Sequence, residues 1–215
     1  MSRINILCFG DSNTYGYIPD GSGRFDESIR WTGLLQKRLG QDFHVIEEGL
    51  CGRTTVFQDA LREGRRGVDL IGTLVESHNP IDILVVMLGT NDCKTRYGAS
   101  AGTIAKGMEQ VIEHAKTAAQ KSASGKVPQV LMISPILLGK GVGEEGYDTE
   151  FDEKSEHVST ELANAYRKVA DRHQYFFLNA ADVASPSTTD REHLDREGHA
   201  ALADAIYEKI QLLSA

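Results

Sequence analysis

A run of six apolar residues, Ile83 to Leu88, constrains the fold of this chain more than any other feature. A strand with one face in water alternates apolar and polar residues, whereas this run is apolar on both faces. Such a strand belongs in the middle of a parallel sheet that helices cover on each side. We therefore expect an α/β fold with this run as a central strand.

Similar short runs alternate along the chain with longer segments whose apolar residues recur at helical spacing. The expected strands are the opening run from Ile4, then Phe43 to Glu47, Ile83 to Leu88, Val130 to Ser134 and Tyr175 to Leu178. The helical stripes run from Trp31 to Leu39, Val68 to His78, Ile104 to Ala115, Val158 to Val169 and Leu202 to Leu213. This alternation predicts a three-layer α/β/α fold around a central parallel sheet of about five strands.

Size and composition fit one such unit. The chain has 215 residues, 40% of them hydrophobic, which is enough for one sizeable core, and it shows no internal repeat and no low-complexity linker. We expect a single domain over residues 1–215.

Charge and hydropathy exclude two classes of partner. A net charge of -8 argues against sequence-independent binding of nucleic acid, which needs clustered Lys and Arg. The longest apolar runs are too short to span a bilayer, and the first residues lead directly into a strand rather than a signal segment. We therefore expect a cytoplasmic protein that contacts neither nucleic acid nor a membrane.

The metal-binding residue types show no metal-binding pattern. Cys8, Cys51 and Cys93 are an odd number without CxxC spacing, so neither a disulfide framework nor a zinc site is indicated. The seven histidines show no paired spacing such as HExxH. We expect no metal ion and no cofactor.

Polar residues follow three of the expected strands. Gly10, Asp11 and Ser12 end the first strand, Gly49 to Gly52 follows the second, and Gly89 to Asp92 follows the third. In a right-handed parallel sheet these strand ends face one edge, where α/β proteins bind ligands. We expect the three groups to converge there.

A carboxylate and an imidazole stand near the carboxyl end of the chain, after the fifth strand. Asp190 precedes His193 by three residues, so its carboxylate can accept the Nδ1 hydrogen and leave Nε2 free to take a proton from a hydroxyl. A serine nucleophile needs this help, because an unassisted hydroxyl attacks poorly at neutral pH. The pattern makes Ser12 a candidate nucleophile.

Several of these residues also have a structural interpretation. Asp and Ser bond their own backbone readily in turns, so Gly-Asp-Ser is also ordinary turn chemistry, and we expect Asp11 and Asp92 to bond backbone in their own turns. We expect Cys51 and Cys93 to be small buried fillers. His78 is expected at a helix end.

His199 is a rival to His193, because Asp195 also places a carboxylate near it. Asp195 resembles the N-cap of the last helix, which would carry His199 into a structural hydrogen bond. We therefore favour His193.

Two segments are expected to be loops. The stretch from Thr14 to Arg30 is rich in Gly and Asp, and the stretch from Leu138 to Glu150 contains four glycines. The second is a candidate lid, although its composition fits a solvated loop as well.

Four blocks in this order resemble the SGNH, or GDSL-type, hydrolase superfamily, named for its Ser, Gly, Asn and His. The matching residues are Ser12 in Gly-Asp-Ser, Gly52 in Gly-Leu-Cys-Gly-Arg-Thr, Asn91 in Gly-Thr-Asn-Asp and His193 in Asp-Arg-Glu-His. The segments around Ser12, Trp31, Glu48 and Asn91 are further similar to the bacterial arylesterase/acyltransferase branch.

This resemblance implies a flavodoxin-like fold and a set of roles. Ser12 would be the nucleophile, His193 the general base and then acid, and Asp190 the group that orients His193. The backbone N–H groups of Ser12 and Gly52 and the side-chain amide of Asn91 would form the oxyanion hole. The branch implies hydrolysis of short-chain acyl esters and a homo-oligomer built from dimers, with an octamer as one form.

The chain departs from the family pattern beside two of these residues. Asn13 stands where Leu or Ile is common, and Arg191 and Glu192 replace a small and an apolar residue between Asp190 and His193. We expect the two charged side chains to shape the entrance of the site or to form structural pairs.

The resulting expectation is a serine esterase of the arylesterase or acetylesterase type, acting on a small-molecule ester and capable of acyl transfer. A carbohydrate O-acetyl esterase would use the same residues. A ligand-binding flavodoxin-like protein without catalysis is disfavoured, because a binder has no need of a base directed at a serine.

Overall fold

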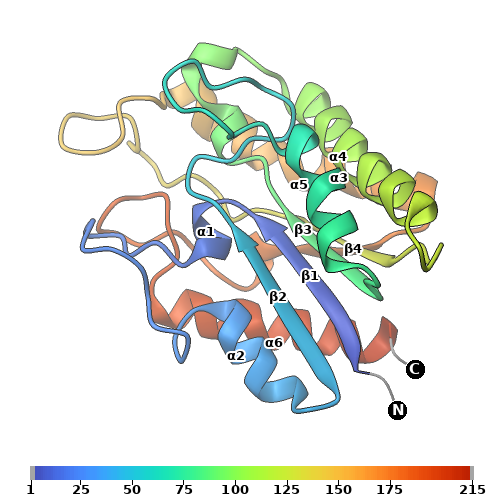
Figure 1. The fold of residues 1–215 in the computed structure, drawn as a ribbon. Coiled ribbons are helices and arrows are strands. Elements are labelled where there is room, and N and C mark those ends of the chain that lie inside the picture. Colours follow the sequence, from blue (N-terminus) through green and yellow to red (C-terminus); the bar gives the residue numbers. More distant parts are fainter. Residues whose placement is uncertain (1–2, 214–215) are drawn as a thin grey trace.

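The computed structural model describes residues 3–213, and a five-stranded parallel sheet forms its centre (Figure 1). The strand order is β2-β1-β3-β4-β5, the flavodoxin-like order. The strands are β1 (Ile4–Gly10), β2 (Phe43–Gly49), β3 (Ile83–Met87), β4 (Gln129–Ser134) and β5 (Phe176–Asn179). The expected fold class is confirmed.

Helices cover both faces of this sheet. On one face lie α2 (Trp31–Leu39) and α6 (Arg196–Leu213), and on the other lie α3 (Gly67–His78), α4 (Ala101–Lys121) and α5 (Glu153–His173) (Figure 1). The short helix α1 (Ser12–Tyr15) and the 3-10 turns Asn91–Cys93, Thr95–Tyr97 and Ala180–Asp182 follow strands at their carboxyl ends.

The two faces divide the apolar residues of the central strands with a period of two. Leu84 and Val86 of β3 pack with α3, α4 and α5, while Ile83, Val85 and Met87 pack with α2 and α6. Successive side chains of a strand point to opposite faces, so a strand buried on both sides needs apolar residues at every position. This is the physical origin of the run from Ile83 to Leu88.

The expected boundaries differ from the structure by a few residues. Strand β2 continues to Gly49, two residues beyond the expected end, and β5 begins at Phe176 rather than Tyr175. The larger difference is α1, because the segment from Thr14 to Arg30 was expected to be loop throughout. One helical turn of four residues is too short to show an apolar period in the sequence.

The carboxyl ends of β1, β2 and β3 lie side by side. Gly10 of β1 pairs in register with Gly49 of β2 and with Met87 of β3. Because these three ends are neighbours, the polar residues that follow them meet at one edge of the sheet, as expected.

The two glycines at this edge allow α1 to pack against the strand ends. A Cβ on Gly10 would lie 2.0 Å from Thr14 Oγ1 and 2.8 Å from the carbonyl oxygen of Met87. A Cβ on Gly49 would lie 2.2 Å from the backbone nitrogen of Tyr15. All three distances are below van der Waals contact, so these positions require Gly.

The segment from 138 to 150 has neither helix nor strand, and it is fixed at its base. Val142 is fully buried, and the backbone N–H of Gly141 donates to Glu156 Oε1 at 2.6 Å. A Cβ on Gly146 would meet nothing within 4 Å, so the tip of the segment is open.

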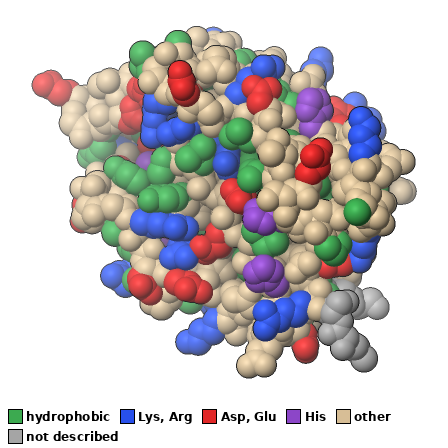
Figure 2. All heavy atoms as spheres, viewed as in Figure 1, with side chains coloured by type: hydrophobic (Ala, Val, Ile, Leu, Met, Phe, Trp, Pro, Cys, Tyr) green, Lys and Arg blue, Asp and Glu red, His purple; other side chains and the backbone are tan. Residues whose placement is uncertain are grey.

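The distribution of surface charge and the composition of the helices complete the description. On the face shown in Figure 2, acidic and basic side chains are interspersed rather than gathered by sign. Within residues 3–213, none of the helices combines the length and the apolar composition that a bilayer span requires.

The contacts of Gly10 yield a stability prediction. Gly10→Ala should destabilise the protein by about 1–3 kcal/mol, because the backbone carbonyl of Met87 cannot move without distorting the sheet. Gly102→Ala is the matched control, since it lies exposed in α4 and its Cβ would approach only Ser100 Oγ, at 3.9 Å. Urea unfolding measures both changes. An unchanged midpoint for Gly10→Ala would show that the turn yields easily.

Candidate active site

Ser12 begins α1 directly after β1, so its side chain stands at the carboxyl edge of the sheet. Asp11 caps this short helix, and its Oδ1 accepts a hydrogen bond from the backbone N–H of Asn13 at 3.0 Å. The cap fixes the turn that presents Ser12, whose side chain is largely enclosed.

Ser12, His193 and Asp190 form a continuous chain of hydrogen bonds. Ser12 Oγ lies 2.8 Å from His193 Nε2, and His193 Nδ1 lies 2.6 Å from Asp190 Oδ2. An ionised carboxylate can only accept, so Nδ1 carries the hydrogen and Nε2 accepts from the Ser12 hydroxyl. This arrangement can move a proton from the serine to the imidazole.

The same carboxylate also shapes the loop that carries His193. Asp190 Oδ1 accepts the backbone N–H of Glu192 at 3.1 Å and that of His193 at 3.0 Å. Asp190 thus fixes both the ring of His193 and the backbone behind it.

Electrostatics strengthen the link between the two residues. Burial of His193 disfavours its charged form, but the carboxylates of Glu192 and Asp190 outweigh burial and raise the pKa of the ring. Burial alone would raise the pKa of Asp190, but the hydrogen bond and charge of His193 outweigh it, so this pKa is lowered. An imidazolium formed at His193 is therefore stabilised.

Arg191 turns the chain between Asp190 and His193. Its φ is +62°, in the left-handed region, and its side chain points away from His193 toward the 138–150 segment. Arg191 Nη1 donates to the carbonyl of Gly141 at 2.9 Å and pairs with Glu144 at 2.9 Å, while its guanidinium lies over the ring of Tyr147. Arg191 therefore forms a structural pair, one of the two roles expected for it.

Asn13, the departure from the family pattern beside Ser12, holds the His193 loop in place. Its Oδ1 accepts the backbone N–H of Leu194 at 2.8 Å, and its Nδ2 donates to the carbonyl of Glu192 at 3.4 Å. The carbonyl of Asn13 accepts the indole N–H of Trp31 at 3.1 Å. One side chain thus joins the backbone on both sides of His193 to the turn that carries Ser12.

The three expected oxyanion-hole residues, Ser12, Gly52 and Asn91, line one cavity together with His193. Gly52 has a φ of +81°, which favours Gly, and Asn91 begins the 3-10 turn after β3. Asn91 Nδ2 donates to the carbonyl of Arg53 at 3.2 Å, which fixes the orientation of the amide. Among the described residues, nothing accepts a hydrogen bond from the backbone N–H of Ser12 or of Gly52.

A buried arginine, Arg53, forms hydrogen bonds with backbone carbonyls at this edge of the sheet. Arg53 Nη1 donates to the carbonyls of Gly10, at 2.8 Å, and Glu48, and its guanidinium lies 4.1 Å from the ring centroid of Phe9. Burial lowers the pKa of Arg53 to about 10, although nearby carboxylates oppose this shift. Arg53 thus joins the ends of β1 and β2.

Asp92 corrects one expectation. Its carboxylate accepts hydrogen bonds from the backbone N–H of Thr55, at 3.0 Å, and from the Thr55 hydroxyl, rather than from its own turn. Complete burial raises the pKa of Asp92 to about 7. Asp11 does bond within its own turn, as expected, and burial raises its pKa to about 6.

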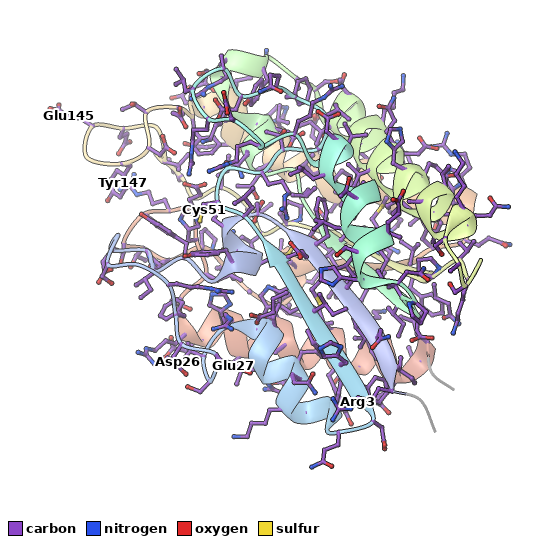
Figure 3. All side chains as sticks on the ribbon, in the orientation of Figure 1. Arg3, Asp26, Glu27, Cys51, Glu145 and Tyr147 are labelled. Carbon is purple, nitrogen blue, oxygen red and sulfur yellow. The ribbon has the colours of Figure 1, made fainter. Side chains whose placement is uncertain are left out.

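The cavity above Ser12 has a volume of about 780 Å³ and a strongly charged lining. Tyr17 lies against His193, with ring centroids 4.6 Å apart. Tyr147 lines the cavity from the 138–150 segment, and in Figure 3 Glu145 projects outward from the tip of that segment. The charged lining residues are Asp20, Arg62, Lys94, Asp148, Glu150, Asp190 and Glu192.

Sequence reasoning missed several of these residues and misplaced one. Lys94 and Tyr147 carry no motif, and only their contacts reveal them; Lys94 Nζ pairs with Glu150. Cys51 is half-buried and lines the cavity rather than being the buried filler that its residue type predicts, whereas Cys93 is buried as expected. The position of Cys51 depends on the turn into Gly52.

His199 lies apart from this cavity. Its Nδ1 accepts the backbone N–H of Trp31 at 3.2 Å, and burial lowers the pKa of its ring to about 4. Asp195 Oδ1 accepts the backbone N–H of Gly198 at 2.8 Å at the start of α6, as an N-cap does. The structural role expected for His199 agrees with these contacts, and His78 ends α3 as expected.

Known proteins similar to this chain are esterases. The profile of the GDSL-like lipase/acylhydrolase family matches residues 8–201. The structure of an aryl esterase from M. smegmatis is 34% identical, with a TM-score of 0.91 over 98% of this chain and 99% of that one.

Two structures from Sinorhizobium meliloti are also similar. A carbohydrate acetylesterase is 33% identical, with a TM-score of 0.89 over 98% of this chain and 100% of that one. A carbohydrate acetylesterase family member is 32% identical, with a TM-score of 0.86 over 97% of this chain and 98% of that one. No curated protein sequence gives a significant match.

The charges around His193 yield a prediction for its titration. Glu192→Gln should lower the pKa of the His193 ring, because a carboxylate that favours the imidazolium is replaced by a neutral amide. The pH titration of the ring protons by NMR measures this pKa. Glu145→Gln, which removes a charge from an exposed position, is the control. An equal shift in both variants would refute a local effect of Glu192.

Proposed function

The chain belongs to the GDSL-like lipase/acylhydrolase family of SGNH hydrolases, and from this premise we propose that it hydrolyses short-chain acyl esters through an acyl-enzyme formed on Ser12. It is a carboxylic ester hydrolase by its family and its esterase neighbours. The observation that carries the proposal is the hydrogen-bonded chain from Ser12 through His193 to Asp190.

Acylation begins when Ser12 Oγ attacks the ester carbonyl carbon. As the Oγ–carbon bond forms, the hydroxyl proton passes to His193 Nε2. The tetrahedral intermediate then loses the alcohol, whose oxygen takes that proton from His193 as the carbon–oxygen bond breaks. Asp190 stays ionised and stabilises the imidazolium throughout.

Deacylation repeats the sequence with water. His193 takes a proton from the water, whose oxygen attacks the acyl carbon, and then returns a proton to Ser12 Oγ as the acid leaves. An alcohol in place of water would give a new ester, so acyl transfer is part of the proposal.

The developing oxyanion needs fixed donors. The backbone N–H groups of Ser12 and Gly52 and the amide of Asn91 line the cavity beside the attacking oxygen, and we assign them this role. Loss of one such donor costs about 3 kcal/mol of activation free energy.

A carbohydrate O-acetyl esterase is the second candidate. The charged lining of the cavity favours it over an esterase for large apolar substrates, and two similar structures are described as carbohydrate acetylesterases. A panel of p-nitrophenyl esters and acetylated sugars separates the two activities.

Three substitutions test the mechanism. Ser12→Ala and His193→Ala should each lower kcat on the order of 10⁴-fold, because nucleophile and base act as a unit. His199→Ala should instead lower the free energy of unfolding, since it leaves the buried N–H of Trp31 unpaired. Initial rates with p-nitrophenyl acetate and urea unfolding measure both effects. Full activity in folded Ser12→Ala, or a reversal between the two histidines, would overturn the assignment.

We further propose a homo-oligomer built from dimers, with an octamer as one form, on the basis of the resemblance to the arylesterase branch. Light scattering of the purified chain should give a mass that is a multiple of the dimer. A monomer at micromolar concentration would refute the branch assignment and leave the chemistry intact.

We also propose a cytoplasmic location. The three cysteines are free in the structure, which fits a reducing compartment. Recovery of the protein in another cell fraction would refute this location.

A further inference from the structure

Glu192 presents a carboxylate to the cavity without a hydrogen-bond donor of its own. The residue is 6% exposed, and it lines the cavity above Ser12. Among the described residues, no N–H or O–H group donates a hydrogen bond to its side chain; His193 Nε2 lies 3.7 Å from Oε1, beyond hydrogen-bond distance. Because this carboxylate faces the cavity and receives no hydrogen bond from the protein, a hydroxyl of a bound ligand can donate to it.

The neighbouring cation, Lys94, already has another partner. Lys94 contributes to the field at Glu192, but its Nζ pairs with Glu150 across the cavity wall. His193 Nε2 is directed at Ser12 Oγ, at 2.8 Å. Neither group therefore satisfies the carboxylate of Glu192.

The backbone of Glu192 is held in place on both sides of the side chain. Its N–H donates to Asp190 Oδ1, and its carbonyl accepts from Asn13 Nδ2. Asp190 and Asn13 thus fix the backbone from which the Glu192 side chain enters the cavity lining.

The position of the carboxylate defines which part of a substrate it meets. In the proposed mechanism, His193 Nε2 protonates the departing alcohol oxygen, and Glu192 Oε1 lies beside that nitrogen. In an ester of a vicinal diol, the free hydroxyl sits on the carbon next to the one that carries the ester oxygen. This hydroxyl is therefore close to the oxygen that His193 protonates, and so to Glu192 as well. Glu192 can therefore accept a hydrogen bond from such a hydroxyl while the ester carbonyl faces Ser12.

We propose that Glu192 is a specificity-determining residue that accepts a hydrogen bond from a hydroxyl adjacent to the ester on the alcohol part of the substrate. The preferred substrates are thus monoacyl esters of vicinal diols and polyols. This inference rests on the proposed function, since it uses the direction of proton transfer from His193.

A matched pair of small esters tests this inference: 2-hydroxyethyl acetate and 2-methoxyethyl acetate. In the second ester a methyl group replaces the hydroxyl hydrogen, so it cannot donate the hydrogen bond. The full chain should hydrolyse the hydroxyl ester with a kcat/KM about tenfold higher or more, since a hydrogen bond to a charged group is worth about 1.5–3 kcal/mol. Rates are measured at a pH above the titration of His193, so that a shift of its pKa does not enter.

Variants then locate the selectivity. Glu192→Leu should bring the ratio of the two kcat/KM values close to one, and Glu192→Gln should give an intermediate ratio, because its amide oxygen still accepts a neutral hydrogen bond. Asp20→Asn removes a charge elsewhere on the cavity wall and should keep the ratio of the unmodified chain. If Glu192→Leu fails to fold by circular dichroism, Glu192→Gln carries the comparison.

The contrary outcomes are distinct. Equal rates for the two esters in the unmodified chain, or an unchanged ratio in a folded Glu192 variant, would overturn the inference. A preference for acetylcholine over 2-hydroxyethyl acetate that Glu192→Leu abolishes would show that Glu192 recognises a cation instead. The activity of Ser12→Ala on the same two esters separates this inference from the proposed function. If Ser12→Ala remains active, the proposed function fails. If it is inactive but the parent chain hydrolyses both esters at equal rates, only the role of Glu192 is overturned.

Discussion

The hydrogen bond between Ser12 and His193 joins residues that are 181 positions apart, and most of the described architecture serves to keep it short. Ser12 is positioned by the end of β1 and its glycine-dependent packing, whereas His193 sits in a loop after the edge strand β5. No regular element connects the two. The connection depends on Asn13. Its side chain forms hydrogen bonds with the backbone on both sides of His193, as a neighbouring strand would in a sheet.

Beneath this contact, the carboxyl edge of the sheet holds an unusual density of buried polar groups. Asp11, Arg53 and Asp92 are all nearly inaccessible to water, and each is hydrogen-bonded to backbone at or after the end of β1 or β2. Such groups are costly to bury unless they are paired, so their pairing fixes one geometry at the edge rather than several. This layer would supply the rigidity that the proposed oxyanion hole requires.

Strands, helices and the convergence of three strand ends could be predicted because each has a local pattern: apolar runs, apolar stripes, and Gly followed by polar residues. Ser12, Asp190 and His193 stood out because chemistry fixes their types and spacing. What escaped prediction depends on contacts across the fold. Thr55 as the partner of Asp92, Lys94 in the cavity wall and Cys51 at its surface have no local signal, since their roles arise only after β2 and β3 have paired with β1 on its two sides. The helix α1 escaped because one turn has no period.

The bonds of Asn13 have an evolutionary consequence. The Gly-Asp-Ser segment and the Asp-Arg-Glu-His segment are far apart in the gene, yet the side chain at position 13 saturates two backbone groups of the second segment. A chimera that took its His193 loop from a relative with Leu at this position would bring a loop shaped for an apolar neighbour. The reverse exchange would leave a buried N–H without an acceptor. We therefore expect the two segments to diverge together, and recombination between them to disrupt contacts that their distance in the sequence does not reveal.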